Sequence, residues 1–151
     1  MTTERTLIIV KPDAMQRGLA GTILTTFENR GLRICGLKLI QIDQELAEQH
    51  YGVHKGKPFF DGLVEFITSA PVIVGVLEGP DAIAAVRATM GGTNPVQSDP
   101  GSIRGRFALE IGHNLIHGSD SAETARFEIS LFFREAELID YRRDIDHWIG
   151  A

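Results

Sequence analysis

Short, strongly apolar runs recur along this chain at intervals that leave room for one or two helices between them. Turn residues such as proline, glycine and aspartate bound these runs, and branched aliphatic side chains dominate them, which is typical of strands in a sheet core. The runs cover residues 6–10, 32–42, 72–77 and 115–117. The sequence therefore predicts four strands.

Between the runs, apolar residues recur at a spacing of three or four, which predicts amphipathic helices. The expected helices cover residues 18–30, 43–51, 58–67 and 82–90, and the third opens at Pro58. Residues 122–133 carry some strand-like alternation. We favour a helix there because residues 120–123 have the spacing of a capping box, with Asp120 or Ser119 as the N-cap.

The order of these elements predicts a ferredoxin-like α+β fold. Two βαβ halves in the order βαββαβ give an antiparallel four-stranded sheet with covering helices. Residues 93–112 show little periodicity and predict a long loop, a feature that is usually functional inside a compact domain. We find no linker, repeat or low-complexity segment, so we expect residues 1–151 to form a single domain, with 134–151 as a C-terminal surface extension.

Charge, cysteine content and hydropathy argue against a nucleic-acid-binding, a disulfide-bonded or a membrane-spanning protein. The net charge of −5 argues against nucleic acid as the main partner, because such binding needs a basic face. The single cysteine, Cys35, cannot form an internal disulfide, which favours a reducing, cytoplasmic compartment. No apolar run approaches the roughly 20 residues that span a bilayer, so we expect no membrane segment.

The segment from Asn114 to Asp120 has the strongest chemical character in the chain. Here two apolar residues precede His117, and small and polar residues follow it just before a predicted helix. The free N–H groups at a helix N-terminus stabilise phosphate, and neutral imidazole is a nitrogen nucleophile near neutral pH. The plainer interpretation is a turn histidine that is simply hydrogen-bonded.

Other polar residues at element ends form a candidate phosphate site. Guanidinium groups bind phosphate oxygens in pairs, and lysine makes single contacts. The candidates are Lys11, Arg87, Thr93, Arg104 and Asn114. Each also has a plainer explanation as a solvated surface group. Glu128 is either a helix-surface acid or the acceptor of a hydrogen bond from His117 that fixes its tautomer.

Motifs that the chain lacks narrow the choice further. It carries no GxxxxGK[ST], GxGxxG or HExxH sequence, which argues against P-loop, Rossmann and zincin proteins. The other histidines lack a second ligand at a convincing metal spacing, so we expect no metal held by protein side chains alone. These histidines are His50, His54, His113 and His147.

From Arg5 to Phe133 the chain resembles nucleoside diphosphate kinases. The most specific match is N-x-x-H-G-S-D over residues 114–120. Three further motifs occur in the family's order: V-K-P-D-A-x-x-R-G over 10–18, Y-x-x-H-K-x-K-P-F-F over 51–60, and G-x-T-N-P over 91–95. The resemblance implies transfer of the γ-phosphoryl of a nucleoside triphosphate to a nucleoside diphosphate, with His117 carrying the phosphoryl between two half-reactions.

The resemblance also implies a role for each candidate residue. Lys11 and Asn114 would contact ribose and phosphate, and Tyr51 would lie near the phosphates. Arg87, Thr93 and Arg104 would clamp the phosphates, while Ser119 and Glu128 would orient His117. Phe59 would stack on the base, although an aromatic residue on a helix is more often part of the core. Mg²⁺ would be bound through the nucleotide phosphates, and the family implies a homo-oligomer, a tetramer or a hexamer.

The chain departs from the family pattern at three positions outside the expected chemistry. Lys57 and His113 stand where arginine is more common, and Arg106 stands where aspartate is usual.

Two alternative functions are a non-catalytic nucleotide-binding or scaffold relative, and a nucleic-acid regulator built on a ferredoxin-like sheet. The first would lack part of the histidine and cation set. The second would need basic and aromatic sheet positions, whereas these strands are aliphatic.

Overall fold

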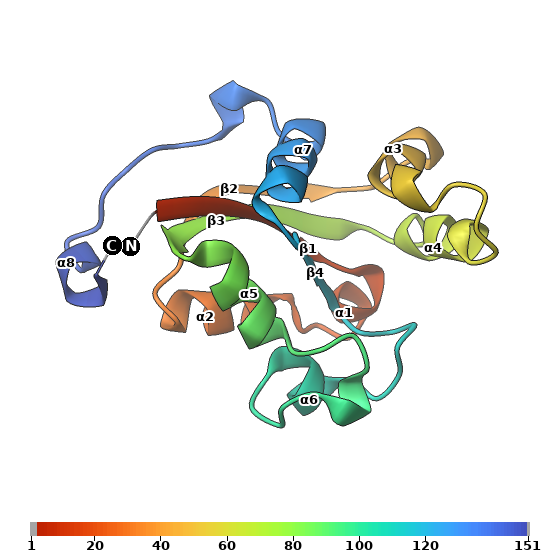
Figure 1. Cartoon of the computed structure of the whole chain (residues 1–151), viewed down its shortest axis with the longest axis horizontal. Coiled ribbons are helices and arrows are strands. Elements are labelled where there is room, and N and C mark those ends of the chain that lie inside the picture. The colour runs from red at the N-terminus through yellow and green to blue at the C-terminus, as the bar shows by residue number, and fades with distance from the viewer. Residues whose placement is uncertain (1–2, 151) are drawn as a thin grey trace.

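The computed structural model describes residues 3–150, which form an antiparallel sheet flanked by helices (Figure 1). Its four strands lie in the order β2-β3-β1-β4. The strands are β1 (Thr3–Val10), β2 (Arg33–Ile40), β3 (Val72–Pro80) and β4 (Ile116–Gly118). Every neighbouring pair is antiparallel, so the predicted ferredoxin-like α+β fold is confirmed.

Alternation along β1 divides the core into two layers. Successive side chains of a strand point to opposite faces. Ile8 and Val10 pack with α2 (Ala20–Asn29) and α5 (Ala82–Met90). Leu7 and Ile9 pack on the other face, beneath three helices. These are α3 (Gln44–His50), α4 (Phe60–Ile67) and α7 (Ala122–Phe132). Figure 1 shows these two groups of helices on opposite sides of the sheet.

Four short helices between β1 and β4 lie outside the predicted strands and main helices. They are α1 (Pro12–Gln16), η1 (Gly52–His54), η2 (Pro95–Gln97) and α6 (Ile103–Phe107). The long loop before β4 is therefore partly structured. The Ser102 hydroxyl accepts from the N–H of Gly105 at 3.0 Å, and Ile103 is buried in the core. The α4 helix begins at Phe60 rather than at Pro58.

The predicted N-cap of the last long helix is wrong, although the helix itself is present. The cap of α7 is Ser121, whose hydroxyl accepts from the N–H of Thr124 at 3.1 Å. Ser119 is not available for this role. Its N–H donates to the carbonyl of Leu7, and its hydroxyl is used by Glu128. Backbone hydrogen bonding to β1 therefore continues for one residue past the end of β4.

The C-terminal segment, which the sequence predicts to be a surface extension, is docked along β2. It contains η3 (Glu135–Glu137) and α8 (Asp146–Ile149). The N–H of Ile139 donates to the carbonyl of Cys35 at 2.8 Å, and the Arg143 guanidinium donates to the carbonyl of Gly31 at 2.8 Å. Within residues 3–150, no helix is both long and apolar enough to span a membrane.

Candidate functional site

His117 lies in the middle of the short strand β4, opposite Ile9 of the buried strand β1. The start of β4 is fixed by a strained residue. Leu115 has a φ of 76°, which is costly for a branched side chain and is typical of functional sites. Its N–H donates to the Asp13 carboxylate at 3.1 Å, and its carbonyl accepts from the N–H of Lys11 at 2.9 Å. These bonds tie the approach to His117 to the end of β1.

The carboxylate of Glu128 fixes the ring of His117. His117 Nε2 lies 3.0 and 2.9 Å from the two Glu128 oxygens, and the Ser119 hydroxyl donates to Oε1 at 2.6 Å. Glu128 is only 4% exposed, so its interpretation as a surface acid is wrong. Burial alone would raise the pKa of Glu128, but the hydrogen bonds and charges of its partners outweigh burial and lower it. The carboxylate stays ionised and selects the tautomer of His117 with the proton on Nε2.

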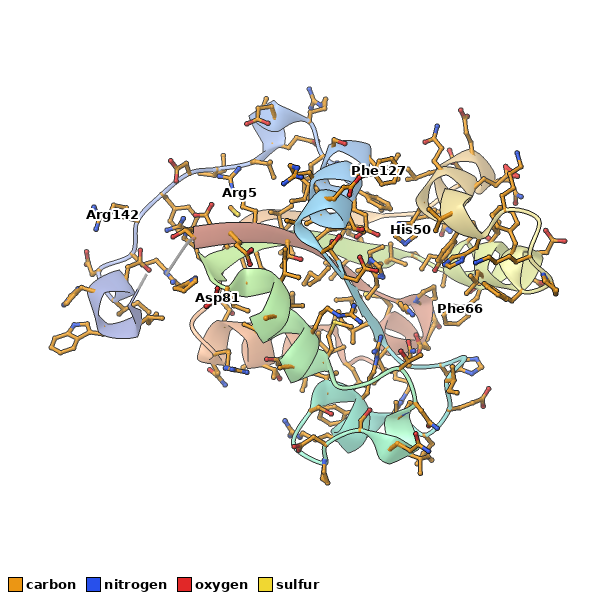
Figure 2. All side chains as sticks on the ribbon, in the orientation of Figure 1. Arg5, His50, Phe66, Asp81, Phe127 and Arg142 are labelled. Atoms are coloured by element: carbon orange, nitrogen blue, oxygen red, sulfur yellow. The ribbon has the colours of Figure 1, made fainter. Side chains whose placement is uncertain are left out.

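His50 joins this group, and motif spacing alone did not reveal it. Its Nδ1 lies 3.4 Å from Glu128 Oε2, and its ring meets the ring of His117 edge-on with centroids 4.9 Å apart. Figure 2 shows His50 between α3 and α7. Burial, and next the neighbouring His117, lower the pKa of His50 to about 3, so the ring is neutral. One signal was available in the sequence: His50 lies three residues after Ala47, on the buried side of α3.

Three cations cluster beside the histidine. The Lys11 ammonium donates to the Asn114 side-chain oxygen at 2.8 Å, and burial together with the nearby Arg104 lowers the pKa of Lys11 to about 8. Burial and the nearby Arg87 likewise lower the pKa of Arg104 to about 10. Arg87 donates to the carbonyl of Gly118 at 3.1 Å. In a protein of net charge −5, this gathering of like charges creates a local anion site.

Arg104 supports the strand as well as adding charge. Its guanidinium donates to the carbonyls of Asn114, Gly91 and Ile116 at 3.2, 3.1 and 2.6 Å. It is 6% exposed, so its interpretation as an ordinary loop charge is wrong. A guanidinium has five N–H donors, so two remain for another acceptor.

The remaining predicted phosphate contacts lie on either side of this cluster. The Asn114 amide donates to the carbonyl of Thr93 at 3.5 Å, which brings the loop after α5 next to β4. The side chain of Thr93 is exposed. The phenol of Tyr51 lies beside His50, with ring centroids 4.6 Å apart, and burial raises the pKa of Tyr51 to about 12. Hydrogen bonds and ring contacts therefore connect nine of the ten predicted site residues around β4, directly or through Asn114 and His50. The tenth, Phe59, lies at the N-terminus of α4.

Phe59 is a surface residue and not part of the core. It is 49% exposed, whereas the next residue, Phe60, is buried at 8%. The ring of His54 meets Phe59 edge-on, with centroids 5.2 Å apart. The ammonium of Lys57 lies 5.8 Å from the centroid of the Phe59 ring, so this unusual lysine contributes to the same surface. The exposed aromatic face provides a stacking platform.

The other two departures from the family pattern contact neighbours in the loop before β4. The Arg106 guanidinium lies 4.6 Å from the centroid of the Phe107 ring. The Nδ1 of His113 lies 3.3 Å from the carboxylate of Glu110, and both side chains are exposed. These local contacts explain how the two substitutions are accommodated at the surface.

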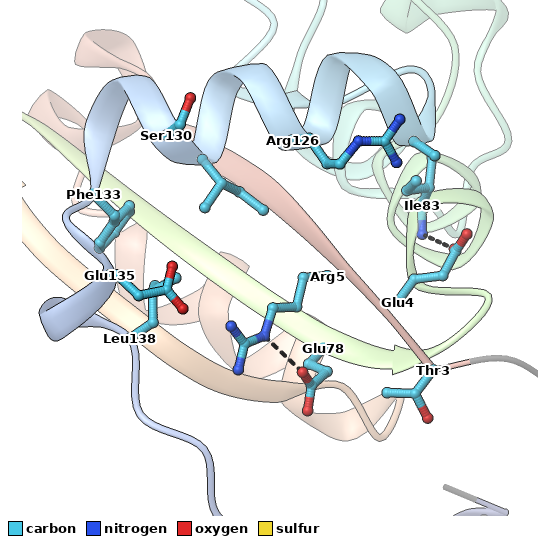
Figure 3. Close-up of a pocket in the computed structure, with 12 residues that line it drawn as sticks. Thr3, Glu4, Arg5, Glu78, Ile83, Arg126, Ser130, Phe133, Glu135 and Leu138 are labelled. Atoms are coloured by element: carbon cyan, nitrogen blue, oxygen red, sulfur yellow. Dashed lines mark hydrogen bonds and ion pairs between the residues drawn. The ribbon is translucent and has the colours of Figure 1, made fainter.

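A cavity of about 660 Å³ lies elsewhere, between α7 and the end of the sheet where β1 begins. Figure 3 shows that the Arg5 guanidinium and the Glu4 carboxylate in this cavity already have partners within the protein. Arg5 donates to Glu78 at 2.7 Å, and Glu4 accepts from the N–H of Ile83 at 3.2 Å. His117 does not line this cavity, so the candidate site is the one around β4.

Comparison with known proteins assigns this arrangement to a family. The sequence profile described as nucleoside diphosphate kinase matches residues 4–138. A nucleoside diphosphate kinase of Thermomicrobium roseum is 63% identical over 146 residues, which cover 97% of this chain and 98% of that protein. The corresponding protein of Roseiflexus castenholzii is 61% identical, with the same coverage.

Solved structures agree with this assignment. A halophilic nucleoside diphosphate kinase from Halobacterium salinarum, solved in complex with CDP, superposes with a TM-score of 0.95 at 51% identity. That match covers 98% of this chain and 99% of the other. A protein of the same family from Babesia bovis gives a TM-score of 0.94 at 44% identity, covering 97% and 99%. Sequence and fold together show that the chain belongs to the nucleoside diphosphate kinase family.

Proposed function

We propose that the protein transfers the γ-phosphoryl group of a nucleoside triphosphate to a nucleoside diphosphate through a phosphohistidine on His117. One observation carries the proposal. Glu128 is hydrogen-bonded to Nε2 of His117, so the ring proton resides there and Nδ1 keeps its lone pair. The His117 side chain is partly exposed, with an accessibility of 26%, so the ring is open to a nucleotide from the surface.

The first half-reaction forms a bond between Nδ1 and the γ-phosphorus and breaks the bond to the bridging oxygen. The bonding electron pair leaves with the nucleoside diphosphate. Positive charge that develops on the imidazole is stabilised by Glu128, whose carboxylate already accepts the Nε2 proton. The second half-reaction reverses these steps with a different nucleoside diphosphate. The histidine therefore needs no proton transfer to solvent.

The cations supply most of the remaining transition-state stabilisation. Phosphoryl transfer needs positioning and neutralisation of charge more than covalent assistance from the protein. Lys11, Arg87 and Arg104 bring positive charge to the site, and two N–H groups of Arg104 remain for phosphate oxygens. Asn114 positions Lys11, and Thr93 lies on the adjoining loop.

We infer broad tolerance for the nucleobase. Phe59 offers an exposed ring, and stacking on a ring does not discriminate among bases because every base has a π-face. Tyr51 borders the same entrance beside His50. A site that selected one base would instead need polar groups arranged to match the edge of that base.

Mg²⁺ fits this site only as part of the nucleotide complex. The ion prefers oxygen ligands and keeps several waters, whereas the side chains around His117 are mostly cationic or nitrogenous. When bound to the nucleotide, it would neutralise phosphate charge. Lys11, Arg87 and Arg104 would hold the phosphates themselves.

We further infer a homo-oligomer, a tetramer or hexamer, located in the cytoplasm. Strand β2 forms an edge of the sheet, and its Leu37 and Leu39 side chains are 47% and 66% exposed. Exposed apolar side chains on a sheet edge favour association with another chain. The free Cys35 supports a reducing compartment.

Steady-state kinetics with ATP and a second nucleoside diphosphate test the proposal. A covalent intermediate predicts parallel lines in double-reciprocal plots, because the first product leaves before the second substrate binds. Intersecting lines would contradict the intermediate. Absence of any turnover would favour the alternative of a non-catalytic nucleotide-binding relative. The histidine, the carboxylate and the cations are all present at one site, which favours catalysis over nucleotide binding alone.

A further inference from the structure

One carboxylate oxygen of Glu128, Oε2, lies close to both His117 and His50. Oε2 lies 2.9 Å from Nε2 of His117 and 3.4 Å from Nδ1 of His50. The three possible ligand atoms all lie within 4.8 Å of one another. The other oxygen, Oε1, lies 3.0 Å from Nε2 of His117 and accepts from the Ser119 hydroxyl at 2.6 Å, and the His50 contact is made to Oε2.

His50 is poorly satisfied in this arrangement. Its side chain is 2% exposed, and Nδ1 is buried without a hydrogen-bond partner despite its nearness to Glu128. Such a group normally finds a partner in the protein, a water or an ion. A neutral imidazole nitrogen without a proton can offer its lone pair to a metal.

Two imidazoles and one carboxylate are a ligand set that zinc uses with a water in the fourth position. Bonds of about 2.0–2.2 Å in a tetrahedron separate neighbouring ligand atoms by roughly 3.3 Å. The separations of 2.9 and 3.4 Å around Glu128 Oε2 bracket this value. Mg²⁺ is a poor match because it prefers oxygen ligands. The ring of His117 is partly exposed, so the three ligands adjoin the protein surface on the side of His117.

We propose that His50, His117 and Glu128 form a binding site for Zn²⁺ and that the bound ion switches the nucleophile off. A ring nitrogen that binds a metal carries no proton. Zinc on Nε2 of His117 therefore moves the single ring proton to Nδ1, with no net proton release. Nδ1 then has no lone pair for the phosphorus. The inhibitory part rests on the proposed function, whereas the binding site does not.

Binding is tested with the full-length protein and Co²⁺ or Zn²⁺ in the absence of nucleotide. We expect one equivalent of Zn²⁺ by calorimetry and the visible absorption of tetrahedral Co²⁺. His50→Gln removes one of three ligands and should weaken binding by roughly 10-fold or more. His113→Gln, which alters an exposed histidine, is the matched control and should bind like the wild type. Equal affinity in all three proteins would overturn the site.

A measurement on the wild type covers the case in which His50→Gln does not fold. Anomalous diffraction at the zinc edge from crystals soaked in Zn²⁺ should place the ion between the two rings and Glu128. An ion at other residues, with this position empty, would overturn the site independently of any variant.

Inhibition is tested by labelling with γ-labelled ATP, with Mg²⁺ in excess and free Zn²⁺ set by a metal buffer. Each protein is compared with its own rate without zinc. Zinc should slow labelling of the wild type and of His113→Gln, and a chelator should restore it, while His50→Gln should need roughly 10-fold more zinc. Equal sensitivity of His50→Gln would overturn the inhibition. Failure of the wild type to label without zinc would instead overturn the proposed function, and metal binding would still be decided by calorimetry.

Discussion

Nε2 of His117 and Oε2 of Glu128 are 2.9 Å apart, although one residue lies on the short strand β4 and the other on the helix that follows it. The pair depends on how α7 is held against the sheet, where Phe132 packs into the core and Ala125 is buried. The hydrogen bond decides which nitrogen of His117 is free. The chemistry therefore depends on the packing of α7 as well as on the histidine itself.

Replacement of Glu128 by glutamine should lower the rate of His117 phosphorylation while leaving nucleotide affinity nearly unchanged. The amide keeps the shape of the side chain but no longer selects one tautomer or stabilises the developing positive charge. We expect a loss on the order of 10²-fold in the single-turnover rate. Rapid-quench labelling and the dissociation constant for ADP check both parts. A large loss of ADP affinity with a normal rate at saturation would identify Glu128 as a ligand contact.

Arg104→Ala and Arg87→Ala should differ in their effect on stability. Arg104 donates to three backbone carbonyls around β4. A hydrogen bond from a charged group contributes at most about 1.5–3 kcal/mol, so the loss of Arg104 should lower the unfolding free energy by a few kcal/mol. Arg87 is exposed and makes one such bond, so its loss should weaken ADP binding with little change in stability. Denaturant unfolding and ADP titration separate the two effects. Equal stabilities for both variants would contradict the supporting role of Arg104.

The free enzyme should lose activity as pH rises through about 8, because Lys11 titrates there instead of near 10.5. Below this pH the ammonium is charged and attracts phosphate, and above it the charge is lost. The effect should appear in kcat/KM for the triphosphate, which reports the free enzyme. Lys11→Arg keeps its charge and should lack this decline. A flat profile for the wild type above about pH 8 would contradict the assignment.

The lowered pKa of Lys11 should affect stability in the opposite direction, so that stability rises with pH where activity falls. Between about pH 8 and 10.5 the unfolded chain keeps the Lys11 proton that the folded protein has lost. The contribution of this residue to the unfolding free energy therefore rises with pH in that range.

Gly118→Ala should destabilise the protein and disturb His117. A Cβ there would lie 2.6 Å from the sulfur of Met90 and 2.9 Å from a methyl of Val86, so β4 or α5 must shift. Overpacking of this kind costs about 1–3 kcal/mol. Gly62→Ala is the matched control, because a Cβ in that helical position meets nothing within 4 Å. It should stabilise the protein by about 0.5–1 kcal/mol. Thermal unfolding of both variants measures these changes in stability. A Gly118→Ala variant as stable as the wild type would show that β4 tolerates displacement.

The sequence predicted the strands, the main helices and the candidate site because those features are local. Apolar runs identify buried strands, and the motif around His117 lies within seven consecutive residues. Lys11 and Asn114 were predicted separately, and their contact follows from the antiparallel pairing of β1 with β4. Local sequence patterns were therefore enough to predict site residues that lie at the ends of neighbouring strands.

Features that depend on packing between distant segments could not be predicted. His50 reaches Glu128 only because α3 lies against α7 on the same face of the sheet. The cap of α7 is Ser121, whereas the Ser119 hydroxyl donates to Glu128 on the same helix. The C-terminal segment follows β2 through backbone bonds such as that from Ile139 to Cys35, which leave no periodic trace in the sequence.

The most direct test of the central claim is isolation of a phosphorylated protein after incubation with γ-labelled ATP. We expect label that survives alkali and is lost in acid, that maps to the peptide containing His117, and that is absent from His117→Gln. The isolated phosphoprotein, freed of nucleotide, should then transfer its label to an added nucleoside diphosphate. Transfer at the wild-type rate by His117→Gln, or label that cannot be transferred to a nucleoside diphosphate, would contradict His117 as the carrier of the phosphoryl group.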